Sequence, residues 1–204
     1  PDLHRRGGAR RLRPAQDPVS DIPLLTVRDL SVTFDVPGGS DGSRREVRAV
    51  RHASFALDRG ETVALVGESG SGKTVTALSV MQLLPYPLAR HPSGSILFAG
   101  QELVGASEDV MRRVRGDRIA MVFQEPMTSL NPLHTIEKQV NEVLIVHKRL
   151  GRRAARARTI ELLRLAGLPE AERRLDAYPH QLSGGQRQRV MIAMALANEP
   201  DLLI

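Results

Sequence analysis

The residues with the most recognisable chemistry form one run, Gly67-Glu68-Ser69-Gly70-Ser71-Gly72-Lys73-Thr74. Its spacing is G-x-x-x-x-G-K-[ST], that of a phosphate-binding loop. The glycines let the backbone wrap closely, so that successive amide N–H groups face phosphate oxygens. We predict that Lys73 reaches the β- and γ-phosphates of a nucleotide and that the Thr74 hydroxyl ligates Mg²⁺. The predicted nucleotide contacts of this loop are Gly67, Ser69, Gly70, Ser71, Gly72, Lys73, Thr74 and Val75.

The segments on either side have the pattern that such a loop requires. Residues 62–66 are a short apolar run, typical of a strand buried on both faces of a parallel sheet. Residues 74–84 predict a helix that ends before Pro85, and its N-terminus favours an anion. The context argues against a glycine-rich loop that arose by accident. The loop by itself indicates only a nucleotide-binding protein.

A second run, Leu182-Ser183-Gly184-Gly185-Gln186, precedes a helix predicted over about 186–197. Ser183 is suited to cap that helix, and the free amides, the hydroxyl and the helix dipole together make an anion site. An ordinary cap accounts for the serine. It gives no reason for two glycines and a glutamine after it.

This run, downstream of a phosphate loop, resembles the signature motif of ABC ATPases. The resemblance implies an α/β fold: a P-loop NTPase (RecA-like) ABC ATPase core with an antiparallel β subdomain and a helical subdomain. It implies a head-to-tail pair of such domains with two ATP molecules at the interface. The residues expected to contact the ATP held by the second domain are Ser183, Gly184, Gly185 and Gln186.

Two further residues take roles from the same resemblance. Gln124 ends the apolar run 119–123 and lies between the two motifs in the chain, where the family has its Q-loop glutamine. The resemblance implies that it ligates Mg²⁺ and orients the attacking water, which makes Lys73, Gln124 and Ser183 the expected catalytic residues. Phe34 stands where the family often stacks an aromatic ring on adenine. An ordinary place in a sheet core explains Phe34 equally well.

The segments 124–132, 130–139 and 178–196 narrow the resemblance. They are similar to the ATPases of dipeptide and oligopeptide importers, and more so to the fused, two-ATPase (Yej-type) subunit of microcin C and peptide importers. This implies ATP hydrolysis with Mg²⁺ at the cytoplasmic face of the cell membrane. The implied partners are a second ATPase domain, transmembrane permease subunits and, indirectly, a peptide-binding protein.

The family pattern continues after an apolar strand with an aspartate for Mg²⁺ and a glutamate that activates water. Here the strand is 202–204 and the sequence stops, so a C-terminal truncation is expected, with weak or no hydrolysis by this piece alone. One alternative is therefore a fragment that binds nucleotide without hydrolysing it. Another is a soluble ABC ATPase that acts on ribosomes or nucleic acid. The Arg-rich start is the only feature that favours this second alternative. We expect no nucleic-acid partner.

Composition bounds the remaining possibilities. Of the 204 residues 41% are apolar and none is Cys, which excludes a disulfide framework. The longest apolar run, 190–197, is far short of the roughly 20 residues of a membrane span. Residues 1–23 carry much of the net charge of +6 and predict a disordered basic tail rather than an arm for nucleic acid or lipid. Residues 24–204 form the predicted ATP-binding domain, with an all-helical inset over about 126–181.

Overall fold

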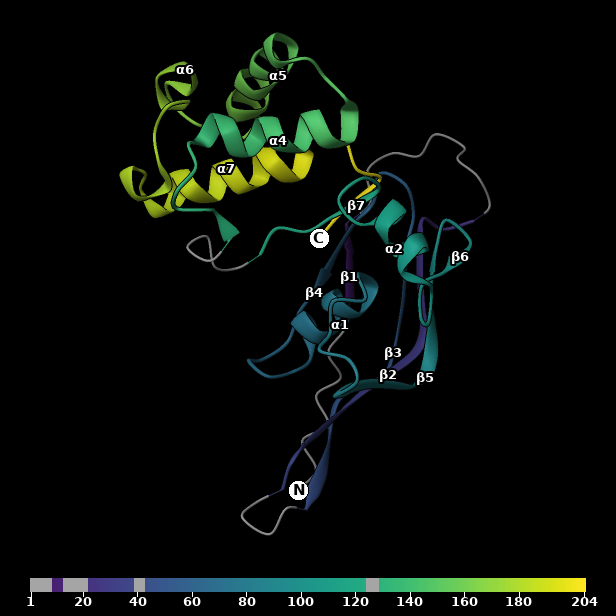
Figure 1. Cartoon of the computed structure of the whole chain (residues 1–204). Coiled ribbons are helices and arrows are strands. Elements are labelled where there is room, and N and C mark those ends of the chain that lie inside the picture. The colour runs from purple at the N-terminus through teal and green to yellow at the C-terminus, as the bar shows by residue number, and fades with distance from the viewer. Residues whose placement is uncertain (1–8, 13–21, 39–42, 124–128) are drawn as a thin grey trace. The chain divides into compact units, whose positions relative to one another are not determined.

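The computed structural model describes residues 9–12, 22–38, 43–123 and 129–204, drawn in colour in Figure 1. The chain divides into two compact units, residues 1–111 and residues 112–204. The short helix α2 (Glu108–Val114) contains the boundary between them. In the part of the chain that the structure describes, no helix has the length and hydropathy needed to cross a membrane.

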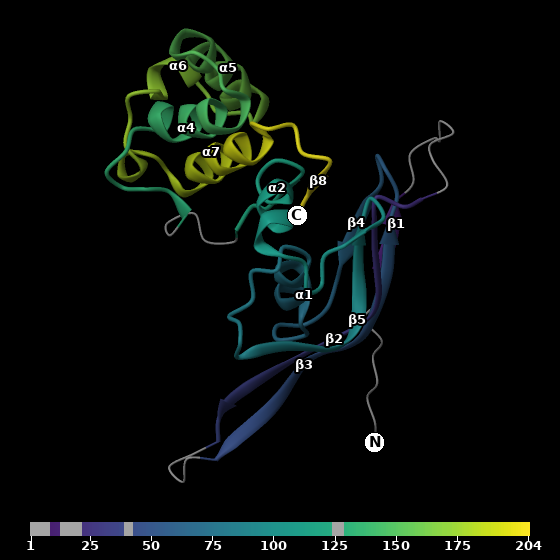
Figure 2. The same ribbon diagram turned by 45° about the vertical axis from the view of Figure 1, so that its right-hand side comes forward.

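The first unit is built on a four-stranded antiparallel sheet in the order β3-β2-β5-β6. Figure 2 labels β2, β3 and β5 of this sheet. These strands are β3 (Arg44–Leu57), β2 (Leu25–Pro37), β5 (Ala89–Phe98) and β6 (Gln101–Glu102). Val27 of β2 lies opposite Phe55 on one side and Ile96 on the other. The apolar side chains of one face form the core of the unit; the most deeply buried include Val27, Leu30, Val32, Ile96, Phe98 and Leu103.

The strand that leads into the phosphate loop differs from its prediction. β4 (Thr62–Leu65) pairs antiparallel with β1 (Ala9–Leu12), not with parallel neighbours. Its side chains are not buried on both faces, since Leu65 is 38% exposed and the adjoining Val66 57%. The expectation of a doubly buried parallel strand is therefore wrong for this structure. An apolar run satisfies its backbone with whichever strand edge lies beside it, and here that strand is β1.

β1 also changes the description of the Arg-rich start. Residues 1–23 were expected to form a tail without regular structure, yet Ala9–Leu12 is a strand in register with β4 from Ala9 opposite Leu65 to Leu12 opposite Thr62. Composition predicts disorder where few apolar side chains can be buried. Main-chain pairing needs no such burial, which is why composition gave no signal for this strand.

The second unit is mainly helical. Its elements are α4 (Ile136–Lys148), α5 (Arg152–Leu165), α6 (Ala171–Arg174), the 3-10 turn η1 (Pro179–Gln181) and α7 (Gly184–Leu196). One apolar cluster joins α4, α5 and α7, and its fully buried members include Ile136, Val140, Leu163 and Val190. The helical core thus extends past residue 181 to include the helix of the signature run.

The same unit contains a pair of parallel strands that are far apart in the sequence. β7 (Ile119–Ala120) lies beside β8 (Leu202–Leu203), with Ile119 opposite Leu202. The pairing continues as Val122 N donates to Ile204 O at 2.9 Å. Parallel strands need a long crossover between them, and here the helices α4 to α7 supply it.

Candidate functional site

The phosphate loop connects β4 to α1 (Lys73–Val80) in the first unit. Residues 66–71 are exposed. Ser71 N donates to Glu68 O at 3.2 Å and closes a turn within the loop. Gly70 and Gly72 have φ angles of 78° and 88°, the left-handed region that glycine enters without steric cost. The glycine spacing of the motif therefore produces an open loop with its backbone accessible to a ligand.

Gly72 is required by packing as well as by its backbone angle. A Cβ atom at this position would lie 2.6 Å from Ala49 O and 3.1 Å from Val50 Cγ2, both on β3. At Gly70 a Cβ atom would meet open space. The second of these glycines thus lets the start of α1 approach the sheet closely.

The N-terminus of α1 has no side-chain cap, because its N-cap residue is Gly72. The first intrahelical bond is Thr76 N to Gly72 O, at 2.8 Å. The first N–H groups of a helix have no partner within it, and they carry the positive end of its dipole. The amides of Lys73, Thr74 and Val75 lie in this first turn, which has no acidic side chain. A phosphate group is the type of anion that such a terminus binds.

Lys73 folds back over the loop. Its Nζ donates to Gly67 O at 3.0 Å, to Glu68 O at 2.7 Å and to Ser71 Oγ at 3.2 Å. An ammonium group has three hydrogens, so this geometry uses all of them on neutral oxygens of the loop. The positive charge is thereby held at the loop with no acidic partner among these three bonds, where an anion can exchange for them. The adjacent residue Thr74 is exposed, so its hydroxyl group is accessible to a ligand.

The signature run lies at the start of α7 in the second unit. Ser183 Oγ accepts from Gln186 N at 3.3 Å, and Gln186 Oε1 accepts from Ser183 N at 2.9 Å. This reciprocal capping box satisfies two donors that the helix cannot. Leu182 anchors the run in the core, at 3% exposed. The sequence analysis identified Ser183 as a cap and missed the role of Gln186 in it. The signal was present, because a serine followed three residues later by a glutamine is the pattern of a capping box.

Gly184 and Gly185 are not required by packing within the described part of the chain. A Cβ atom on either would meet open space, and neither has a positive φ. Glycine is also a weaker helix former than alanine, so helix propensity gives no reason for either residue. The described residues therefore leave both glycines open to close approach by another group.

The structure bears differently on Gln124 and Phe34, the other two residues with a predicted role. Gln124 lies outside the described residues, so its predicted role stays a prediction. Phe34 is half-buried on β2, opposite Val47 on β3 and Ala89 on β5. Val47 is two residues from the Ala49 carbonyl that faces Gly72, which places Phe34 on the part of the sheet beside the loop. This position is compatible both with sheet packing and with adenine stacking.

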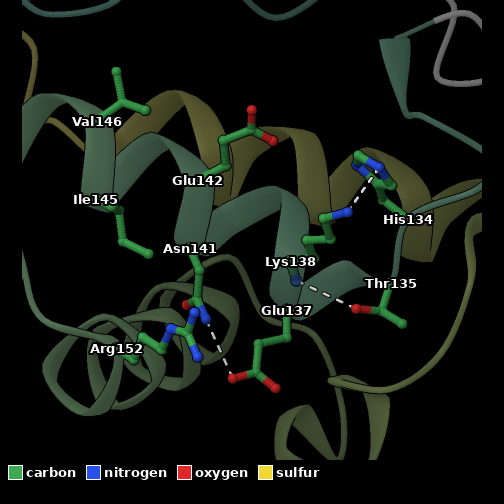
Figure 3. A pocket seen from close by; sticks show the side chains of 9 residues that line it. All are labelled: His134, Thr135, Glu137, Lys138, Asn141, Glu142, Ile145, Val146 and Arg152. Atoms are coloured by element: carbon green, nitrogen blue, oxygen red, sulfur yellow. Dashed lines mark hydrogen bonds between the residues drawn. The ribbon is translucent and has the colours of Figure 1, made fainter.

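A pocket of about 640 Å³ lies along one face of α4 and was not foreseen from the sequence (Figure 3). It combines apolar Ile145 and Val146 with both signs of charge. Lys138 Nζ lies 2.9 Å from His134 Nε2, and Asn141 Nδ2 donates to Glu137 Oε1 at 3.2 Å. Its lining residues are His134, Thr135, Glu137, Lys138, Asn141, Glu142, Ile145, Val146 and Arg152. The sequence contained one signal of this pocket: residues 145 and 146 are apolar but do not belong to the buried face of the helix.

Comparison with curated proteins gives close relatives. The peptidoglycan transport ATP-binding protein YejF of Agrobacterium fabrum is 61% identical over 89% of this chain and 32% of its own length. The oligopeptide transport ATP-binding protein OppD of Bacillus subtilis is 51% identical over 89% of this chain and 49% of its own. The chain thus spans a third to a half of the length of these relatives.

Solved structures support the fold. The dimeric post-hydrolysis state of the ATP-binding cassette MJ0796 bound to ADP and Pi matches with a TM-score of 0.75 and 30% identity, over 88% of this chain and 72% of that one. This likeness confirms the predicted α/β P-loop NTPase fold. The family model described as ABC transporter matches residues 50–204, a range that includes the phosphate loop and the signature run. The chain belongs to the ABC transporter family.

Proposed function

We propose that this chain is the ATP-binding part of a subunit that hydrolyses ATP to energise peptide import. The observation that carries the proposal is the uncapped start of α1 with Lys73 held over the loop, because this arrangement fits a polyphosphate. The relatives narrow the cargo, since their names refer to peptidoglycan and oligopeptide transport.

The residues of this chain divide the work as follows. The backbone of residues 67–75 holds the phosphates, and Lys73 exchanges its bonds to loop oxygens for the β- and γ-phosphates. Thr74 and Gln124 would hold Mg²⁺, which would supply positive charge to offset the negative charge of the transferred γ-phosphoryl group. Gln124 orients the attacking water, and Phe34 stacks on the adenine. Positioning and charge, rather than covalent chemistry, carry such a reaction.

The signature run acts on a second ATPase domain. Ser183 Oγ and the amides of Gly184 and Gly185 contact the γ-phosphate of the ATP held by the other domain. The open space around both glycines supports this assignment, because a close approach of phosphate needs a backbone without side chains. The MJ0796 cassette, a structural relative, is itself dimeric.

The membrane partners would be permease subunits, met at the cytoplasmic face of the membrane. The α4 pocket supports a protein contact on the helical unit, since Ile145 is 41% exposed and Val146 65%. Exposed apolar side chains bordered by charged ones are typical of surfaces that bind another protein. A peptide-binding protein would be an indirect partner, through the permease.

The test uses the complete subunit and replaces Lys73 with Ala. Because the ammonium charge acts on the phosphates, we expect ATP hydrolysis, followed by phosphate release, to fall at least about 100-fold. Lys148→Ala, which removes an exposed lysine at the end of α4, is the matched control and should leave the rate unchanged. Equal rates for the two variants would contradict the proposal. If the parent protein binds ATP without releasing phosphate, the proposed function is limited to nucleotide binding. Peptide uptake by cells that carry each variant tests the transport role.

A further inference from the structure

Two arginines near the start of α7 reach back to main-chain carbonyl groups of the preceding segments. Arg187 Nε donates to Pro179 O in η1, at 2.8 Å. The guanidinium of Arg189 donates to Gly167 O, after the end of α5. These bonds connect the helix of the signature run to two loops of the second unit.

Arg187 bonds to both ends of the segment 179–183, which leads into α7. Its backbone N donates to Ser183 O at 2.9 Å, while its side chain, directed toward the helix N-terminus, reaches Pro179. Leu182 N donates to the same Pro179 carbonyl at 3.1 Å. The side chain of Arg187, a half-buried residue, thus links the first turn of α7 to η1.

The position of Arg187 runs against local helix preference. A cation close to a helix N-terminus faces the positive end of the dipole, and the first turn of α7 has no acidic residue to offset it. Such a departure from local rules is expected where function requires it. The charge also makes the bond to Pro179 O stronger than a neutral one.

The capping box alone does not determine where the N-terminus of α7 lies relative to η1. Ser183 and Gln186 bond to each other, so the cap moves with the helix end as one body. Arg187 adds a bond to a group outside that body, a carbonyl in η1 whose residue is buried. Its removal leaves the cap formed but less firmly placed.

We propose that Arg187 is a positioning residue for ATP hydrolysis. Through Pro179 it holds Ser183 and the amides of Gly184 and Gly185 where they meet the γ-phosphate of ATP bound by a second ATPase domain. The inference rests on the proposed function of the signature run. Small displacements of groups that position a reacting centre are costly, with about 1 Å able to lower a rate 100-fold.

The experiment compares substitutions in the complete subunit. Arg187→Met keeps the aliphatic stem and removes the donors, while Arg187→Lys keeps the charge and a donor. For Arg187→Met we expect kcat to fall about tenfold with KM for ATP changed less than about twofold, since its own phosphate loop is intact. Arg187→Lys should recover part of kcat. Arg153→Met, which replaces an exposed arginine of α5, is the control and should match the parent protein.

The contrary outcomes are separable. If Arg187→Met has the kcat of Arg153→Met, the inference is overturned. If it lowers the thermal midpoint, the ATP affinity and kcat together, and Arg187→Lys does the same, Arg187 serves the fold alone and the inference is overturned too. If Lys73→Ala retains full hydrolysis, the proposed function itself fails, which no result at Arg187 can mimic.

Discussion

The starts of α1 and α7 both contain glycine, yet the two helices differ in how their first backbone donors are capped. α1 begins at Gly72 with no side-chain cap, whereas the cap of α7 is a complete box of Ser183 and Gln186. An uncapped start depends on water or a ligand to satisfy its amides. The box at the start of α7 satisfies Ser183 N and Gln186 N, and it leaves the amides of Gly184 and Gly185 without an intrahelical partner. This difference fits a loop that encloses its own nucleotide and a signature run that presents a preformed surface to another domain.

The two units also differ in how far their apolar residues are covered. The helical unit encloses its cluster, with Leu144 at 1% exposed. In the first unit the strand before the phosphate loop leaves Leu65 at 38%. Exposed apolar strand residues are suited to pairing or packing with another element. Three substitution pairs test these contrasts.

The largest expected effect compares two leucines. Leu144→Ala should lower the free energy of unfolding by about 2–5 kcal/mol, because it opens a cavity in the helical cluster. Leu65→Ala should lower it by less than about 1 kcal/mol, as is usual for partly exposed positions. Urea denaturation measures both. Equal losses would show that β4 is covered in solution and that the contrast between the units is wrong.

A pair of glycines separates backbone strain from steric contact at the phosphate loop. Gly70→Ala should lower the free energy of unfolding by about 1–2 kcal/mol, the usual penalty of a left-handed backbone. Gly72→Ala should cost more, because its Cβ atom would also lie 2.6 Å from Ala49 O. The free energy of unfolding and the affinity for ATP, measured together, check this. A Gly72→Ala protein as stable as Gly70→Ala would mean that α1 does not approach β3 this closely.

The smallest expected effect compares two helix caps. Ser183 caps α7, and Thr135 caps α4 by accepting from Lys138 N at 3.3 Å. Replacing either with Ala should lower the free energy of unfolding by about 1 kcal/mol. Only Ser183→Ala should also reduce phosphate release by the complete subunit. If Thr135→Ala reduces it equally, capping rather than phosphate contact explains the effect of Ser183.

Local sequence determined most of what lies within one stretch of chain. The spacing of Gly67, Gly72 and Lys73 predicted the phosphate loop, and Ser183 predicted the cap of α7, because backbone angles and helix caps depend on neighbours a few residues away. The helices predicted over 74–84 and about 186–197 likewise lie close to the observed α1 and α7.

Contacts between distant residues were decided only by the tertiary structure. The sequence did not show that β4 pairs with β1, that α7 shares the core of α4 and α5, or that Arg187 bonds to Pro179. Main-chain pairing and side-chain bonds to carbonyl groups leave no periodic or compositional pattern, since every residue has a carbonyl to offer. The chemistry of each motif was therefore set by local spacing, while its placement was set by folding.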